Sequence, residues 1–350
     1  MDRYIGLDVH TTTTTMAVVG PSGRRLKTQV LETNGKALIE ALRMMPGRRH
    51  VCLEEGTQAE WLYEVLKPHA DELVVAKIAE SRGSKSDTRD AFGLAERLRT
   101  GDLKTTVFKD VSVFATLREL NRLYTMVLSD VVRTKNRLKN LFRSRGVATP
   151  DADVYGKKGR PAWLRKLSKG KRWAAETLYN ELDTLTELHD RTNADLVREA
   201  WRHPIAQKIE TCPGFGPIRT AQLMAVVVTP HRFRTKRQFW AYCGLAIVTR
   251  SSSDWVRDKS GRGWIRSNIQ TTRGLNRNHN HALKHVFKGA ATTVIAQGTT
   301  PLSQDYARLV ANGTKPNLAK LTLARRIAAI VLAIWKTNEE YNPTKHRKQS

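Results

Sequence analysis

The stretch that decides the fold begins at Tyr4-Ile5-Gly6-Leu7-Asp8 and ends at Ser86-Asp87-Thr88-Arg89-Asp90. Its pattern predicts three strands, a helix, a strand, a helix, a strand and a last helix that opens on acidic residues. A Gly-Pro-Ser-Gly turn at residues 20–23 separates the second and third strands, which predicts a β-hairpin. Apolar residues at helical spacing predict the helices that follow. This order of elements predicts an α/β domain built on a mixed sheet.

Acidic residues stand at the ends of three separate elements of this domain. Asp8 closes the first strand, Glu54 closes a strand at residues 50–54, and Asp87 and Asp90 lie in the first turn of the last helix. Two carboxylates three residues apart share a helix face, and the two strands are expected to lie side by side. Four converging carboxylates repel one another unless a divalent cation neutralises them. Hard oxygen ligands favour Mg²⁺ or Mn²⁺, the usual ions of phosphodiester cleavage. Alternatively, Asp87 and Asp90 merely suit a helix N-terminus.

The charge of the chain points to a polyanionic partner. The 350 residues carry 60 Lys and Arg against 33 Asp and Glu, a formal net charge of +27. No apolar run reaches the length of a membrane span and the N-terminus has no signal-peptide pattern, so nucleic acid is expected rather than an anionic membrane surface. Three scattered cysteines support neither a disulfide framework nor a zinc site, and the ten histidines show no metal-ligand spacing. We expect a cytoplasmic, nucleoid-associated bacterial protein.

The middle of the chain predicts long helices. Apolar residues from Leu117 to Leu141 alternate spacings of three and four, interrupted at Thr134, and a second seam ending at Leu196 is interrupted at His189 and Thr192. The two seams could form an antiparallel hairpin, or one could pair with another subunit; a homodimer is favoured. Residues 150–173 predict a basic, glycine-punctuated loop that orders on a phosphate backbone, or else a solvated linker. The nucleic-acid contacts expected in the middle of the chain are Arg133, Arg137, Lys157, Lys158, Arg160, Lys171 and Arg172.

Two features of the C-terminal part suggest phosphate chemistry. Pro213-Gly214-Phe215-Gly216 precedes a predicted helix, as in a helix-hairpin-helix turn, where Gly214 and Gly216 would let backbone N–H groups approach a phosphate. Ser251-Ser252-Ser253 follows an apolar helix that ends at Gly244-Leu245. Cationic side chains near an exposed serine suit phosphoryl transfer, although on chemistry alone a polar loop is favoured. The further expected phosphate contacts are Arg82, Lys85, Arg250, Arg257, Lys259 and Arg262.

Taken together, these motifs resemble the DEDD transposases of bacterial insertion sequences, the IS110 family, with the Piv/MooV-type DNA invertases as relatives. The resemblance includes Ile5-Gly6-Leu7-Asp8, Val51-Cys52-Leu53-Glu54, residues 85–91, Pro213-Gly214-Phe215-Gly216, and Gly244-Leu245 with the serines beyond. It implies an N-terminal RNase H-like domain similar to the Holliday-junction resolvase RuvC, in which the four acids hold Mg²⁺.

The resemblance also implies a serine nucleophile, which the count from Gly244-Leu245 places at Ser252. Relatives tend to have glycine after this serine, and here Ser253 stands there, so Ser251 and Ser253 are alternatives. Relatives also differ after the glutamate, which makes Glu55 an alternative ligand to Glu54.

The resemblance further implies partners and a division into domains. The implied partner is double-stranded DNA, both the element ends and the target. Relatives also use a structured noncoding guide RNA and assemble as dimers that meet in a tetramer. The expected domains are a RuvC-like catalytic domain at 1–108, a helical coiled-coil region at 109–200, a C-terminal transposase domain at 201–342 and a basic tail at 343–350. The expected activity is DNA recombination through a 5′-phosphoserine. The alternatives are a junction-resolving endonuclease or invertase that uses metal-activated water, and a non-enzymatic nucleic-acid-binding protein.

Overall fold

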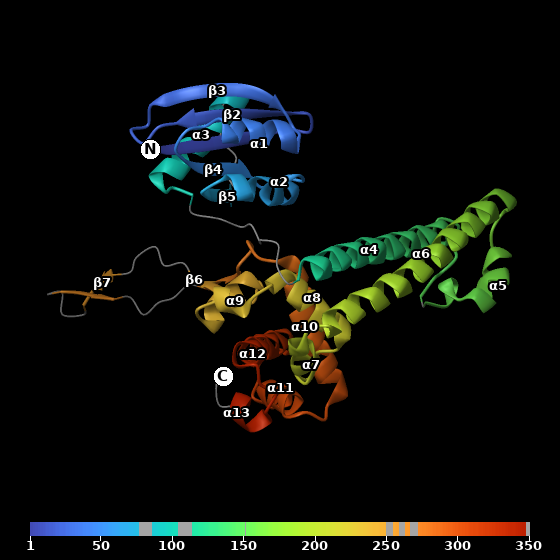
Figure 1. Cartoon of the computed structure of the whole chain (residues 1–350). Coiled ribbons are helices and arrows are strands. Elements are labelled where there is room, and N and C mark those ends of the chain that lie inside the picture. The colour runs from blue at the N-terminus through green and yellow to red at the C-terminus, as the bar shows by residue number, and fades with distance from the viewer. Residues whose placement is uncertain are drawn as a thin grey trace. The chain divides into compact units, whose positions relative to one another are not determined.

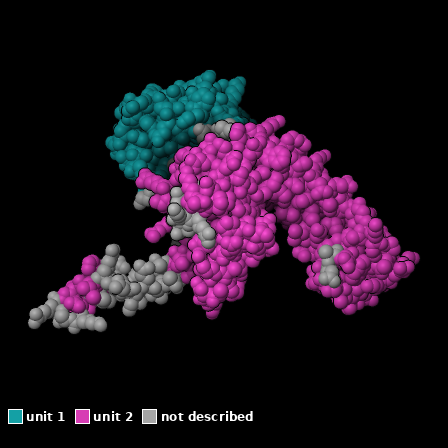
Figure 2. Space-filling model, turned by 90° about the horizontal axis from the view of Figure 1, so that it is seen from below, with its two compact units in different colours: residues 1–112 teal, residues 113–350 magenta. Residues whose placement is uncertain are grey.

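A computed structural model describes residues 1–76, 86–103, 114–150, 152–249, 255–258, 263–266 and 272–347. The chain divides into two compact units, residues 1–112 and 113–350 (Figure 2). The largest cluster of buried apolar side chains in each unit draws on that unit alone, so each unit has a hydrophobic core of its own.

The N-terminal unit is a five-stranded mixed sheet with helices on both faces (Figure 1). Its elements are β1 (Asp2–Val9), β2 (Thr13–Val19), β3 (Arg25–Glu32), α1 (Gly35–Arg43), β4 (Arg48–Glu54), α2 (Ala59–Leu66), β5 (Glu72–Ala76) and α3 (Asp87–Thr100). The strand order is β3-β2-β1-β4-β5, with β1 and β3 antiparallel to β2, and β4 parallel to both β1 and β5. The predicted α/β architecture is therefore confirmed, and the arrangement is that of an RNase H-like domain.

The two faces of the sheet pack against different helices. Leu7 and Leu53 belong to the core formed with α1 and α2, whereas Ala91 of α3 is buried on the opposite face. Side chains alternate between the two faces along a strand. Asp8 and Glu54, the next residues after the two leucines, are therefore on the side of the sheet that α3 covers.

The close contact between β1 and α3 depends on Gly6. A Cβ atom at this position would lie 2.0 Å from the backbone oxygen of Ala91 and 2.7 Å from the backbone nitrogen of Ala95. Because both are backbone atoms, the whole helix would have to move to admit a side chain. Gly6 thus fixes how near the first turn of α3, with its two acids, comes to the end of β1.

Gly6→Ala is expected to destabilise the N-terminal unit by about 3 kcal/mol, the upper end of the usual cost of overpacking. Gly93→Ala is the matched control, because Gly93 lies in α3, the helix that Gly6 contacts, and a Cβ there would meet nothing within 4 Å. This control should gain about 0.5–1 kcal/mol from better helix propensity. Urea denaturation of both variants measures the difference, and an equal effect of the two would show that β1 and α3 are not tightly packed.

The C-terminal unit is mainly helical, as predicted. Its helices are α4 (Ala115–Arg143), α5 (Arg160–Leu164), α6 (Lys169–Trp201), α7 (Pro204–Glu210), α8 (Pro217–Val227), α9 (Lys236–Tyr242), α10 (His281–Gln297), α11 (Pro301–Ala311), α12 (Pro316–Thr337) and α13 (Pro343–Arg347). Two short antiparallel ribbons join β6 (Ile247–Thr249) to β9 (Thr272–Leu275) and β7 (Trp255–Arg257) to β8 (Trp264–Arg266). The main core gathers around α12, and Leu117 of α4 and Leu196 of α6 belong to it.

Helices α4 and α6 pack along each other within one chain, side by side in Figure 1. The antiparallel hairpin, one of the two predicted arrangements, is therefore present. The residues that interrupt the two apolar seams lie in the interface between α4 and α6. Thr134 is 1% exposed and its hydroxyl lies 3.1 Å from Glu181 Oε1, Thr192 is also buried, and the His189 ring lies 5.3 Å from that of Tyr124.

The predicted basic loop between these helices is folded, contrary to expectation. Besides α5, it contains 3₁₀ turns at residues 152–155 and 157–159. Val154 and Leu167 are buried against Phe142 and Tyr179 of the long helices, and the Tyr179 hydroxyl donates to the Val154 carbonyl at 2.8 Å. The segment has too few apolar residues to show a periodic pattern, and its partners are distant in sequence.

The cysteines contribute no disulfide. Cys52, Cys212 and Cys243 are buried as free thiols. Burial raises the pKa of Cys52 to about 12, so this thiol stays protonated and packs as an apolar side chain. As for membranes, none of the helices in the described parts of the chain combines the length and hydropathy that crossing a bilayer requires.

Candidate active site

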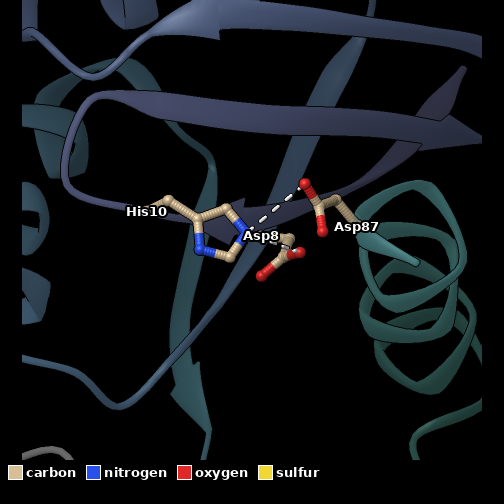
Figure 3. Close-up of side chains that lie close together, drawn as sticks. All are labelled: Asp8, His10 and Asp87. Atoms are coloured by element: carbon tan, nitrogen blue, oxygen red, sulfur yellow. Dashed lines mark ion pairs between the residues drawn. The ribbon is translucent and has the colours of Figure 1, made fainter. Parts of the chain in front are cut away.

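The end of β1 and the start of α3 bring two of the predicted acids together (Figure 3). Asp8 is the second-to-last residue of β1, and Asp87 is the first residue of α3. His10 Nε2 lies 3.5 Å from Asp8 Oδ2 and 3.5 Å from Asp87 Oδ2. One possible ligand atom from each residue lies within 4.8 Å of the other two. Among the described residues, these three form a group that could hold a metal ion.

The carboxylates of Asp8, Asp87 and Asp90 repel one another at this site. Burial raises the pKa of Asp8, His10 offsets part of this rise, and the charges of Asp87 and Asp90 raise it further. The Asp8 side chain is 17% exposed, whereas that of Asp87 is 61% exposed. A carboxylate partly removed from water thus faces two other carboxylates, and a bound cation would relieve this cost.

Glu54 ends β4, the parallel neighbour of β1, and the register pairs the two strands as far as residues 7 and 53. Asp8 and Glu54, the next residues, therefore lie at the ends of adjacent strands, and both line a cleft of about 300 Å³. Glu55, the alternative ligand, lines the same cleft. Glu54 is not one of the three side chains whose ligand atoms are gathered, so it stands next to this group rather than within it.

The donor set fits a hard divalent cation. Carboxylate oxygens suit Mg²⁺ and Mn²⁺, and an imidazole nitrogen suits transition metals. Asp8, His10 and Asp87 are placed to hold such an ion, with Asp90 in the same turn of α3 and Glu54 at the next strand end.

His10 is the member of this group that the sequence analysis missed. It follows Asp8 by two residues at the end of β1, and the alternation of side chains along a strand puts residues two apart on the same side. The signal for it is its position two residues beyond a predicted ligand at the end of a strand.

The predicted nucleophile lies outside the described residues. The same is true of several predicted phosphate contacts. These residues are Ser251, Ser252, Ser253, Arg82, Lys85, Arg250, Lys259 and Arg262. Arg257 is described: it is exposed on β7, with its guanidinium 5.8 Å from the centre of the Trp264 ring.

The predicted contacts on the helical hairpin differ in what they do. Arg160 donates two hydrogen bonds to Asp183, at 2.6 and 2.7 Å, and its side chain is 15% exposed, so it stabilises the junction of α5 with α6. Lys158 and Lys171 are exposed and suit a phosphate backbone better. The remaining four have protein partners: Arg133 pairs with Asp130, Arg137 with Glu181, Lys157 with Asp183, and Arg172 donates to the carbonyls of Leu164 and Leu167.

The predicted helix-hairpin-helix-like turn has a structural reason for its first glycine. Gly214 has φ +84°, and a Cβ there would lie 2.5 Å from the backbone oxygen of Ala290 in α10. Arg219 donates to the Gly214 carbonyl at 2.7 Å and closes the turn. Gly216 is the N-cap of α8 and has open space around it, so it is the position that leaves room for a ligand.

Comparison with known protein families finds matches to two segments of the chain. Residues 5–145 match the DEDD transposase model of IS110, and residues 206–308 match a model described as Transposase IS116/IS110/IS902 family. The first match contains all four predicted acids, and the second contains the serine-rich segment. A search of curated proteins found no match. The chain therefore belongs to the IS110 family of DEDD transposases.

Proposed function

We propose that the protein is an insertion-sequence transposase that cuts and rejoins DNA strands, using Mg²⁺ held by Asp8, Glu54, Asp87 and Asp90 together with a serine nucleophile. The observation that carries the proposal is the meeting of Asp8 and Asp87 at the C-terminal end of the central strand of an RNase H-like sheet. When bound there, Mg²⁺ (or Mn²⁺) would stabilise the charge that builds up on the phosphate oxygens. The acids serve to hold the ion and to set where the phosphate lies.

Ser252 is the proposed nucleophile, supported by its distance from Gly244-Leu245 and by the family match over this region. Its Oγ attacks the phosphorus atom, the bond from phosphorus to the 3′ oxygen breaks, and the leaving 3′ oxygen takes up a proton. The 5′ phosphate stays on the serine. A 3′-hydroxyl of another strand then attacks the same phosphorus and releases the serine, so the bond energy is conserved and no ATP is required.

The proposed partners are the DNA of the element ends and of the target, and a noncoding guide RNA, with two dimers forming a tetramer. The net charge of +27 supports a polyanionic partner, and the exposed Lys158, Lys171 and Arg257 supply part of it at the surface. The proposed location is the cytoplasm, in association with the nucleoid.

Trapping the protein–DNA adduct tests the serine step. A plasmid carrying the DNA that flanks the gene, labelled downstream of the cut, is incubated with full-length protein, Mg²⁺ and transcribed flanking RNA, then denatured. The wild type should retain label on the protein, and Ser252→Ala should retain none, while Ser251→Ala and Ser253→Ala keep it. Loss of the adduct in Ser251→Ala or Ser253→Ala alone would move the nucleophile to that position. Cleavage without any adduct would instead indicate metal-activated water, as in a junction-resolving nuclease.

A further inference from the structure

His10 is held at the acidic site by the backbone of the β1–β2 turn. Its backbone N–H donates to the Thr13 carbonyl at 2.9 Å, and the Thr33 hydroxyl donates to the His10 carbonyl at 2.9 Å. The Thr33 hydroxyl also lies 2.8 Å from that of Thr14, which is fully buried. The backbone of His10 is therefore fixed by the fold, and its Nε2 faces the carboxylates of Asp8 and Asp87 (Figure 3).

The distances around His10 are longer than those of a hydrogen-bonded ion pair and closer to the spacing of neighbouring metal ligands. His50, in the N-terminal sheet, shows the shorter contacts of a hydrogen-bonded ion pair: its Nδ1 lies 2.7 Å from Glu72 Oε2 and its Nε2 lies 3.1 Å from Asp2 Oδ1. His10 uses one nitrogen for two carboxylates, at 3.5 Å from each. A charge-assisted hydrogen bond is about 2.7–2.9 Å long. Two ligands at right angles, each about 2.1 Å from one ion, lie about 3 Å apart, which is close to the observed spacing.

We propose that His10 Nε2 is a ligand of the divalent ion, beside Asp8 and Asp87, and that it shifts the metal preference of the site from Mg²⁺ toward Mn²⁺. This inference rests on the metal site of the proposed function. Neutral imidazole offers a lone pair at Nε2 when its proton is on Nδ1. Mg²⁺ is bound through oxygen ligands, whereas first-row transition ions accept nitrogen readily. A set of acids alone would lack this bias.

Pulsed electron paramagnetic resonance of bound Mn²⁺ tests the proposal on the full-length protein without DNA. The wild type should show modulation from a directly bound nitrogen, and ¹⁵N-histidine labelling should change its frequency. The signal should be lost in His10→Gln and kept in His50→Gln, the matched control from the same sheet. His10 is half exposed, so its substitution should leave the core intact, which circular dichroism checks.

Metal titration gives a second readout that does not depend on activity. His10→Gln should weaken Mn²⁺ binding about tenfold or more and Mg²⁺ binding much less, and His10→Asp should favour Mg²⁺. Mn²⁺ that binds in the wild type and not in Asp8→Asn, yet shows no nitrogen modulation, would overturn the role of His10 and leave the metal site standing. Mn²⁺ binding that Asp8→Asn leaves unchanged would overturn both this inference and the metal site of the proposed function.

Discussion

Asp8→Asn is expected to slow DNA cleavage about 1000-fold or more while making the metal-free protein more stable. The slowing follows because a catalytic metal ion contributes several kcal/mol of transition-state stabilisation, and each 1.36 kcal/mol is a factor of ten in rate. The gain in stability follows because Asp8 is largely buried and faces Asp87 and Asp90. Removing its charge should add about 1 kcal/mol to the free energy of unfolding without metal. Added Mg²⁺ should then raise the melting temperature of the wild type and not of the variant.

Asp71→Asn is the control, because its effect on stability should have the opposite sign and its cleavage rate should not change. Asp71 accepts a hydrogen bond from the backbone N–H of Arg49 at 2.7 Å, and this bond holds the pKa of its carboxyl below the usual range. The variant should lose stability and keep both its cleavage rate and its response to Mg²⁺. A loss of stability in Asp8→Asn, measured without metal, would show that the acids at the site do not repel one another.

The acids of the site were predictable from the sequence, because each of them stands at the end of an apolar strand pattern or in the first turn of a predicted helix. The strands that end at Asp8 and Glu54 were predicted to lie side by side, and the parallel register of β1 with β4 agrees. Gly6 also has a signal in the sequence, since a glycine inside a strand often marks close approach of another backbone. His10 had one too, in its position two residues after Asp8.

Contacts between residues far apart in sequence could not be predicted in the same way. Thr134 broke the apolar seam of α4 in the sequence, yet it is buried because Glu181, on the other long helix, meets its hydroxyl. Arg160 lies among lysines in the sequence, and Asp183 of α6 fixes its guanidinium. Gly214 lies in a turn after a proline, and Ala290 of α10 lies where a Cβ at this glycine would stand. Each outcome depends on a partner that local pattern does not reveal.

Glu54→Gln is expected to slow cleavage about 1000-fold, whereas Glu55→Gln should slow it less than about tenfold. Glu54 pairs in register with Ala76 of β5. Its side chain is on the same face of the sheet as that of Asp8, which is the face that α3 covers. The Glu55 side chain is directed to the opposite face of the sheet. Its backbone N–H donates to the Ala76 carbonyl at 2.9 Å, which keeps the chain extended there.

The two variants should also separate metal binding from chemistry. The Glu54 carboxylate stands outside the group of Asp8, His10 and Asp87, so we expect it to join the ion only when the DNA phosphate is bound. Glu54→Gln should therefore lower the single-turnover cleavage rate far more than the affinity of the DNA-free protein for Mn²⁺, whereas Asp8→Asn should lower both. A cleavage defect larger in Glu55→Gln than in Glu54→Gln would assign the ligand to Glu55, and would require β4 to end one residue earlier when the ion binds.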